Sequence, residues 1–129
     1  MSAVLQDIRA RRQATWFGLF GGAMAWTVHL MLAYGVAEFG CVGRLADRDY
    51  LGVSLVAWLE IALTIATTLT AAAATCVAHL QYRRLKSGPD NMTDFAERRM
   101  AWTGVITSGL FTFIIVFESI PILYYLHTC

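Results

Sequence analysis

Three ionisable residues lie inside long apolar stretches of this chain: His29, Glu60 and Glu118. A charge in hydrocarbon is costly, so such residues usually face the interior of a helical bundle and mark a function. One imidazole and two carboxylates can ligate a divalent metal, carry protons or hydrogen-bond a quinone head group. The same set can also form a buried polar network that only sets the register of the helices. Residue types alone leave these alternatives open, and the cofactor stays unknown.

The apolar stretches around these residues are long enough to cross a bilayer. Of the 129 residues, 57% are hydrophobic and 15% are charged, whereas about a quarter of a soluble domain is charged. Because roughly 20 apolar residues span the hydrocarbon core, we predict transmembrane helices over about residues 14–38, 52–81 and 100–126. The expected fold is an all-α integral membrane bundle of three helices, forming a single domain over residues 1–129. The first stretch is too long for a signal peptide, so we expect it to be retained.

The distances of the three ionisable residues from the helix ends predict that they share one level. Each lies nine or ten residues from the first residue beyond the outer end of its predicted helix, which is Phe39, Leu51 or His127. At about 1.5 Å rise per residue, this places each of them roughly 13–15 Å below the outer surface. We therefore expect the side chains of His29, Glu60 and Glu118 to meet inside the bundle or against a partner subunit.

The distribution of lysine and arginine predicts the orientation. The connection between the first two helices carries only Arg44 and Arg48, and the third helix is followed by no basic residue other than His127. The chain has ten lysines and arginines in all. The other eight lie in the N-terminal lead and in the connection between the second and third helices: Arg9, Arg11, Arg12, Arg83, Arg84, Lys86, Arg98 and Arg99. Because cytoplasmic loops are enriched in lysine and arginine, we expect the N-terminus in the cytoplasm and the C-terminus outside. The net charge of +1 and the lack of a nucleic-acid motif argue against a nucleic-acid partner.

Small residues recur at helical spacing in the first and third stretches. Gly18 and Gly22 lie four residues apart, as do Gly104 and Ser108. Such pairs let membrane helices approach closely. They predict packing inside the bundle, with a dimer seam as the alternative.

The three cysteines show no metal-binding spacing. Cys41 and Cys129 both follow outer helix ends, where a disulfide can persist, and a bridge between them would join the first helix to the third. Two free thiols or a copper-binding pair are the alternatives. Cys76 is expected to be a small buried residue near the cytoplasmic end of the second helix.

The first helix and the C-terminal end resemble a group of small bacterial three-helix membrane proteins. The resemblance is carried by the order Gly22, Trp26, Tyr34 and Cys41, and by Pro121 ahead of the terminal Cys129. These proteins accompany haem-copper terminal oxidases and their copper-insertion factors. The resemblance thus implies the bacterial inner membrane, a role in the respiratory chain, and other membrane subunits, including a haem-copper oxidase, as partners besides the lipid bilayer. The group commonly has Gly-Pro at Gly21-Gly22 and varies at His29, so no site is carried over.

We therefore expect a non-catalytic accessory or assembly subunit of a bacterial respiratory or electron-transfer membrane complex. One alternative is a small intramembrane protein that handles redox chemistry, a metal or a quinone through His29, Glu60 and Glu118. Another is a homo-oligomeric proton or ion conductor. No hydrolase, kinase or phosphate-loop motif occurs in the sequence, so an enzyme is not predicted.

Overall fold

The computed structural model describes residues 1–44, 47–87 and 92–125. Within these ranges it describes the backbone but not the side chains of residues 2–4, 41, 92–94, 122–123 and 125. Three helices fill most of the described part of the chain: α1 (Ser2–Val42), α2 (Leu55–Lys86) and α3 (Met92–Tyr125). Each contains a segment long and apolar enough to cross a membrane. The prediction of an all-α bundle with three such helices is confirmed.

The helices run further than a membrane requires. α2 has 32 residues, or about 48 Å at 1.5 Å per residue, against a hydrocarbon core of roughly 30 Å. α1 already begins at Ser2 and α3 at Met92, where the sequence predicted helices from about 14 and 100. Hydropathy indicates only the part that lies in lipid, whereas backbone hydrogen bonding carries a helix on through polar residues.

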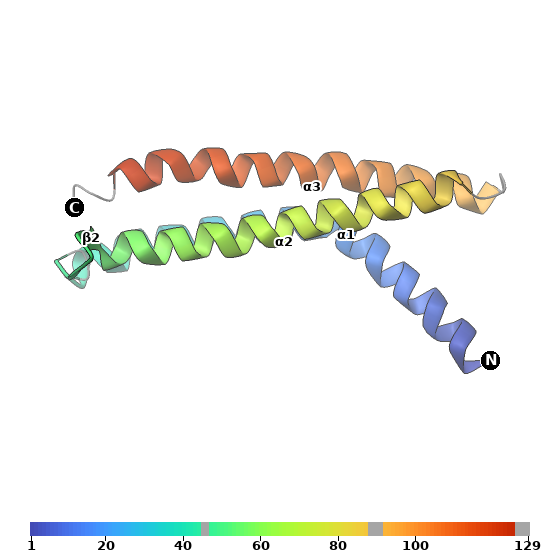
Figure 1. The fold of residues 1–129 in the computed structure, drawn as a ribbon, viewed down its shortest axis with the longest axis horizontal. Helices are drawn as coiled ribbons and strands as arrows, with labels where there is room; N and C mark the ends of the chain where they lie inside the picture. The colour runs from blue at the N-terminus through green and yellow to red at the C-terminus, as the bar shows by residue number, and fades with distance from the viewer. Residues whose placement is uncertain (45–46, 88–91, 126–129) are drawn as a thin grey trace.

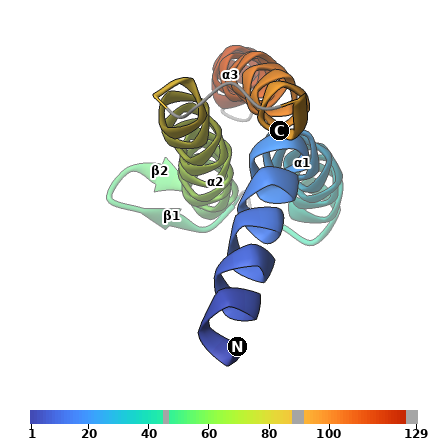
Figure 2. The ribbon, with the colours of Figure 1, turned by 90° about the vertical axis from the view of Figure 1, so that its right-hand side faces the viewer.

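The helices pack as an antiparallel bundle in which α1 and α3 both lie along α2 (Figure 1). α1 also contacts α3, so each helix touches the other two, as the end-on view shows (Figure 2). The N-terminal part of α1 splays away from the bundle (Figure 1). Helices suit lipid because every backbone polar group inside them is satisfied within the segment.

A short hairpin joins α1 to α2, and it makes the second helix begin later than predicted. β1 (Asp49–Tyr50) pairs antiparallel with β2 (Val53–Ser54). The turn between them uses positive φ at Leu51 (56°) and Gly52 (77°), the two-residue geometry that matches strand twist. Helix α2 therefore begins at Leu55 rather than 52, and Ser54 caps it by accepting a hydrogen bond from the Ala57 N–H at 3.3 Å.

Small residues set the close approach of α1 to the other helices. A Cβ added to Gly22 would lie 2.5 Å from the Ser108 Cα, and one added to Gly18 would lie 3.0 Å from the Ala78 Cβ. Ser108 also links the backbones, since its hydroxyl donates to the Gly18 carbonyl at 2.7 Å and accepts from the Gly22 N–H at 3.3 Å. A Cβ on Gly104 would meet the Gly18 carbonyl oxygen at 3.0 Å. The structure thus brings Gly18, Gly22, Gly104 and Ser108 together inside the bundle.

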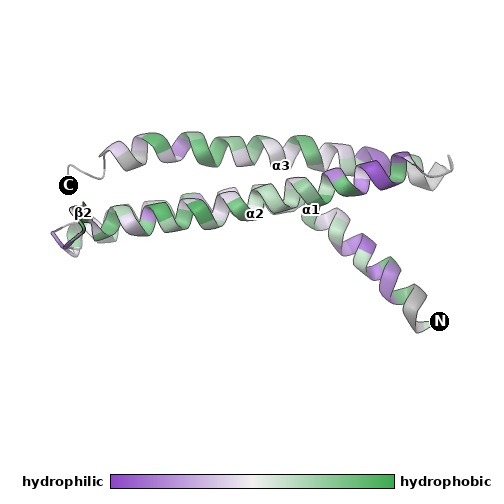
Figure 3. Cartoon of the chain, in the orientation of Figure 1, coloured by the Kyte–Doolittle hydropathy of each residue, from purple (hydrophilic) through white to green (hydrophobic). Residues whose placement is uncertain are grey.

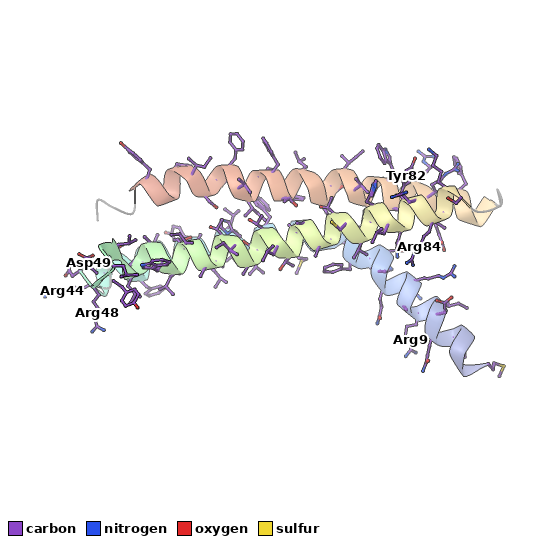
Figure 4. All side chains as sticks on the ribbon, viewed as in Figure 1. Arg9, Arg44, Arg48, Asp49, Tyr82 and Arg84 are labelled. Carbon is purple, nitrogen blue, oxygen red and sulfur yellow. The ribbon has the colours of Figure 1, made fainter. Side chains whose placement is uncertain are left out.

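Hydrophilic residues gather at one end of the bundle. This end holds the start of α1, the end of α2 and the start of α3 (Figure 3). Arg9 and Arg84 lie there, whereas Arg44, Arg48 and Asp49 lie at the hairpin end (Figure 4). The middle of each helix is predominantly apolar, so the two charged ends bracket a band that matches a membrane interior.

We predict that Gly22→Ala destabilises the bundle, whereas Gly35→Ala does not. The new methyl at position 22 would collide with Ser108 backbone, and overpacking of this kind costs about 1–3 kcal/mol. Nothing lies within 4 Å of a Cβ built on Gly35, so alanine there should be neutral or stabilise by up to about 1 kcal/mol through helix propensity. Unfolding in mixed detergent with increasing dodecyl sulfate, followed by circular dichroism, measures both. Equal stability of the two variants would contradict the packing described.

Candidate functional site

The imidazole of His29 connects all three helices. It projects from α1, and the residue is 0% exposed. Its Nδ1 lies 3.1 Å from the Thr67 hydroxyl on α2, and its Nε2 lies 3.4 Å from the Ser119 hydroxyl on α3. A second link joins α2 to α3 directly, because the Thr64 hydroxyl donates to the Ser119 Oγ at 3.1 Å. We call His29, Thr64, Thr67 and Ser119 the histidine network.

The hydroxyl protons of the histidine network have competing acceptors. Thr67 donates to the Leu63 carbonyl at 2.8 Å, and Ser119 donates to the Ile115 carbonyl at 2.7 Å. While Thr67 and Ser119 donate their protons to these carbonyls, each of them turns an oxygen lone pair, not a proton, toward a ring nitrogen of His29. A neutral imidazole has one N–H and one acceptor nitrogen, so one hydroxyl must turn its proton toward the ring. The network therefore supports more than one proton arrangement, which is the property a proton-carrying group needs.

Glu60 lies at a different level from His29, contrary to the expectation from the sequence. The packing register of α1 on α2, which sets Gly18 against Ala78 and Gly40 against Val56, places His29 opposite Thr67. Thr67 lies about two helical turns beyond Glu60, roughly 10 Å along the axis. Glu60 is itself 1% exposed, and its Oε1 has no hydrogen-bond partner. Counting residues from hydropathy boundaries missed this offset because α1 continues to Val42 rather than 38, and because the hairpin delays the start of α2 to Leu55.

Glu118 lies nearer to His29 than Glu60 does but makes a different bond. Its Oε2 accepts a hydrogen bond from the Trp26 indole N–H at 3.0 Å. The carboxylate is close enough to His29 to interact with it electrostatically, although no hydrogen bond joins the two. Glu118 is half-buried, at the boundary between the bundle interior and the outer surface of α1 and α3.

The side chains of His29, Glu60 and Glu118 therefore do not all meet in the bundle. Among the described residues, no group of three histidine, cysteine, aspartate or glutamate side chains could hold a metal ion. The Cys41 side chain and all of Cys129 lie outside the described residues, and so does the predicted disulfide or copper-binding pair. Cys76 is a free thiol on the exposed side of α2, not the buried residue expected, because α2 turns its alanines Ala71, Ala74 and Ala78 inward instead.

An apolar groove opens between α1 and α2, and Thr67 is one of the residues that line it. It has a volume of about 540 Å³, and aromatic residues of α1 and small residues of α2 line it, including Phe17, Phe20, Met24, Ala66, Thr67 and Thr70. The Thr67 and Thr70 hydroxyls donate to the carbonyls of Leu63 and Ala66, each at 2.8 Å. Because both hydroxyl protons are used in these bonds, the two hydroxyls could only accept hydrogen bonds from a quinone-type head group in this groove.

The sequence analysis identified His29 and Glu118 but not the side chains that form hydrogen bonds with them: Trp26, Thr67 and Ser119. One sequence signal could have identified these partners: a hydroxyl or indole side chain in the same or a neighbouring apolar stretch as an ionisable residue. Such a side chain is expected to bind the ionisable group because hydrocarbon offers no other hydrogen-bond partner.

The fold and these buried polar groups define a multi-pass membrane protein, a three-helix bundle with a histidine network in its interior. Comparison with protein-family models, with curated proteins and with solved structures gave no match.

We predict that Thr67→Val destabilises the bundle more than Thr70→Val. Both threonines donate to the carbonyl four residues earlier, but only Thr67 also meets the His29 ring. Polar contacts between membrane helices contribute on average about 0.6 and at most about 1.7 kcal/mol, so a loss in this range is expected for Thr67→Val and almost none for Thr70→Val. Unfolding in dodecyl sulfate, with His29→Phe added to complete a double-mutant cycle, isolates the pair. A coupling of zero between positions 29 and 67 would show that the contact does not stabilise the fold.

Proposed function

We propose that this chain is a non-catalytic accessory or assembly subunit of a bacterial membrane complex that transfers electrons. The single observation that carries the proposal is the surface of α3 that faces away from the bundle. Large apolar side chains follow one another there at alternating spacings of four and three residues, and each is more than half exposed: Ile106, Leu110, Phe113, Phe117 and Ile120. We call these five residues the α3 outer face.

The spacing of the α3 outer face supports a helix partner. Apolar residues repeating every three and four positions form the seam along which two helices interlock. The rings of Phe113 and Phe117 lie 4.5 Å apart, tilted by 34°, and together make a ridge that can enter the groove of another helix. The other two helices of this chain already pack on the opposite side of α3.

The charge distribution supports the same orientation that the sequence predicts. Arg83, Arg84 and Lys86 lie in the last turn of α2, at the same end as Arg9 (Figure 4). By the positive-inside rule, we infer that this end lies in the cytoplasm and the hairpin end outside. The inner membrane of a bacterium and an electron-transfer complex, with a haem-copper oxidase among the candidate partners, rest on the resemblance in the first helix and the C-terminal end.

We predict that the double variant Phe113→Ala, Phe117→Ala releases the partner complex. Mild-detergent purification of the full chain from its own membranes should yield other membrane subunits and the optical spectrum of their redox cofactors. Loss of two large side chains should lower that yield by roughly tenfold, which corresponds to about 1.4 kcal/mol. The control is Ile65→Ala, Leu69→Ala, which removes two exposed apolar side chains from α2 instead and should leave the yield unchanged. A wild-type chain that purifies alone and without redox cofactors would rule out the subunit role.

Proton transfer is the second candidate, and the histidine network favours it. An imidazole between hydroxyl groups can pass a proton from one ring nitrogen to the other. The subunit role predicts that vesicles containing the purified chain show no proton flux beyond that of empty vesicles, measured with an internal pH-sensitive dye. A flux that Ser119→Ala, Glu60→Gln or Glu118→Gln abolishes would favour the conductor instead.

A further inference from the structure

We infer that Glu118 binds an arginine or lysine side chain carried, at matching depth, by a transmembrane helix of a different protein. The inference rests on the proposed function and names the chemistry of the partner. It follows from the position of the carboxylate, from the Trp26 indole beside it and from the distribution of basic residues in this chain.

The Glu118 carboxylate has an unfilled capacity for hydrogen bonds on the outer side of the bundle. A carboxylate accepts about four hydrogen bonds through its two oxygens, and among the described residues the Trp26 indole is the one donor that Glu118 has. The side chain is half-buried, so part of it faces outward at a depth where lipid tails supply no donor. Polar groups at such depths are normally satisfied by protein, often by a residue of opposite charge.

The Trp26 indole next to Glu118 favours a cation as the missing partner. The Trp26 ring packs against Phe111 of α3, with centroids 5.2 Å apart, and Phe111 lies about two turns before Glu118 on the same helix face. An arginine or lysine that reached the carboxylate would lie near the Trp26 indole, with which a cation–π attraction can form. Arginine fits best, because its planar guanidinium can pair with a carboxylate and stack on an indole.

A second copy of this chain cannot supply that cation. No lysine or arginine occurs in residues 13–43, 49–82 or 100–129, which include the three spans. His29, the one basic residue at a similar depth, is fully buried and occupied by the histidine network. Charge complementarity therefore points to a different protein rather than to a homodimer.

Glu60 provides the matched control. It is also a membrane-embedded carboxylic acid, but it is 1% exposed, so a neighbouring helix cannot reach it. A glutamine at either position removes the possible charge and keeps the side-chain shape. An effect of Glu118→Gln that Glu60→Gln lacks therefore reports on the outer surface and not on acidity inside the bundle.

A reconstituted system tests the chemistry directly. The full chain, labelled with a donor dye at its N-terminus, is mixed in phosphatidylcholine vesicles with an acceptor-labelled leucine-alanine transmembrane peptide bearing one central arginine. Energy transfer should exceed that of the same peptide with leucine in place of the arginine. The excess should disappear with Glu118→Gln and persist with Glu60→Gln. Equal transfer for the arginine and leucine peptides with the wild-type chain would overturn the inference.

A cross-linking experiment in native membranes separates this inference from the proposed function. A photoreactive benzoylphenylalanine at position 114, half-buried and one turn before Glu118, captures whatever helix docks there, and mass spectrometry identifies the captured peptide. A transmembrane segment of another protein with an arginine or lysine is the expected product. A segment without a cation, or a segment of this same chain, would sink the inference. A foreign segment without a cation would still leave the subunit role standing. Absence of any adduct, together with a chain that purifies alone, would remove both.

Discussion

The two ring nitrogens of His29 impose the constraint on which the bundle depends. A buried imidazole in hydrocarbon has no water to satisfy it, so its hydrogen-bond partners must come from the protein. Thr67 supplies one from α2 and Ser119 supplies the other from α3. Both partners can reach the ring only at one rotation and one axial position of each helix. A single side chain thus favours the same register of α2 and α3 on α1 that the glycine contacts set, whereas apolar contacts between similar aliphatic surfaces specify a register only weakly.

The histidine network can close only because small residues let the helices approach. Gly18 and Gly22 leave no room for a side chain against Ala78 and Ser108. Ser108 then bonds to the backbone of α1 at both glycines. These contacts lie about two to three turns before His29 along α1, so close packing at the glycines and hydrogen bonding at His29 reinforce one arrangement. Contacts of both kinds replace the hydrophobic driving force, which is weak between helices surrounded by lipid.

The same register divides the two intramembrane carboxylates. Glu60 is enclosed, whereas Glu118 lies at the edge of the bundle with an indole N–H on one oxygen. An enclosed acid is shielded from any other helix. An acid at the edge keeps acceptor capacity where a neighbouring helix can reach it, on the helix that also carries the α3 outer face. Packing within the chain, rather than residue type, therefore decides which carboxylate is available to a partner.

The sequence by itself determined the three spans and the residues that are costly to place in them, because hydrophobic length and intramembrane charge are properties of short segments. It also indicated the small residues at which helices meet. It did not determine which polar groups meet. The hairpin at Asp49–Ser54 moved the start of α2, and the glycine contacts set its axial position against α1. An offset of about two turns then placed Thr67, not Glu60, beside His29. Relative height and rotation of helices arise from contacts between distant segments, so only the tertiary structure could decide them.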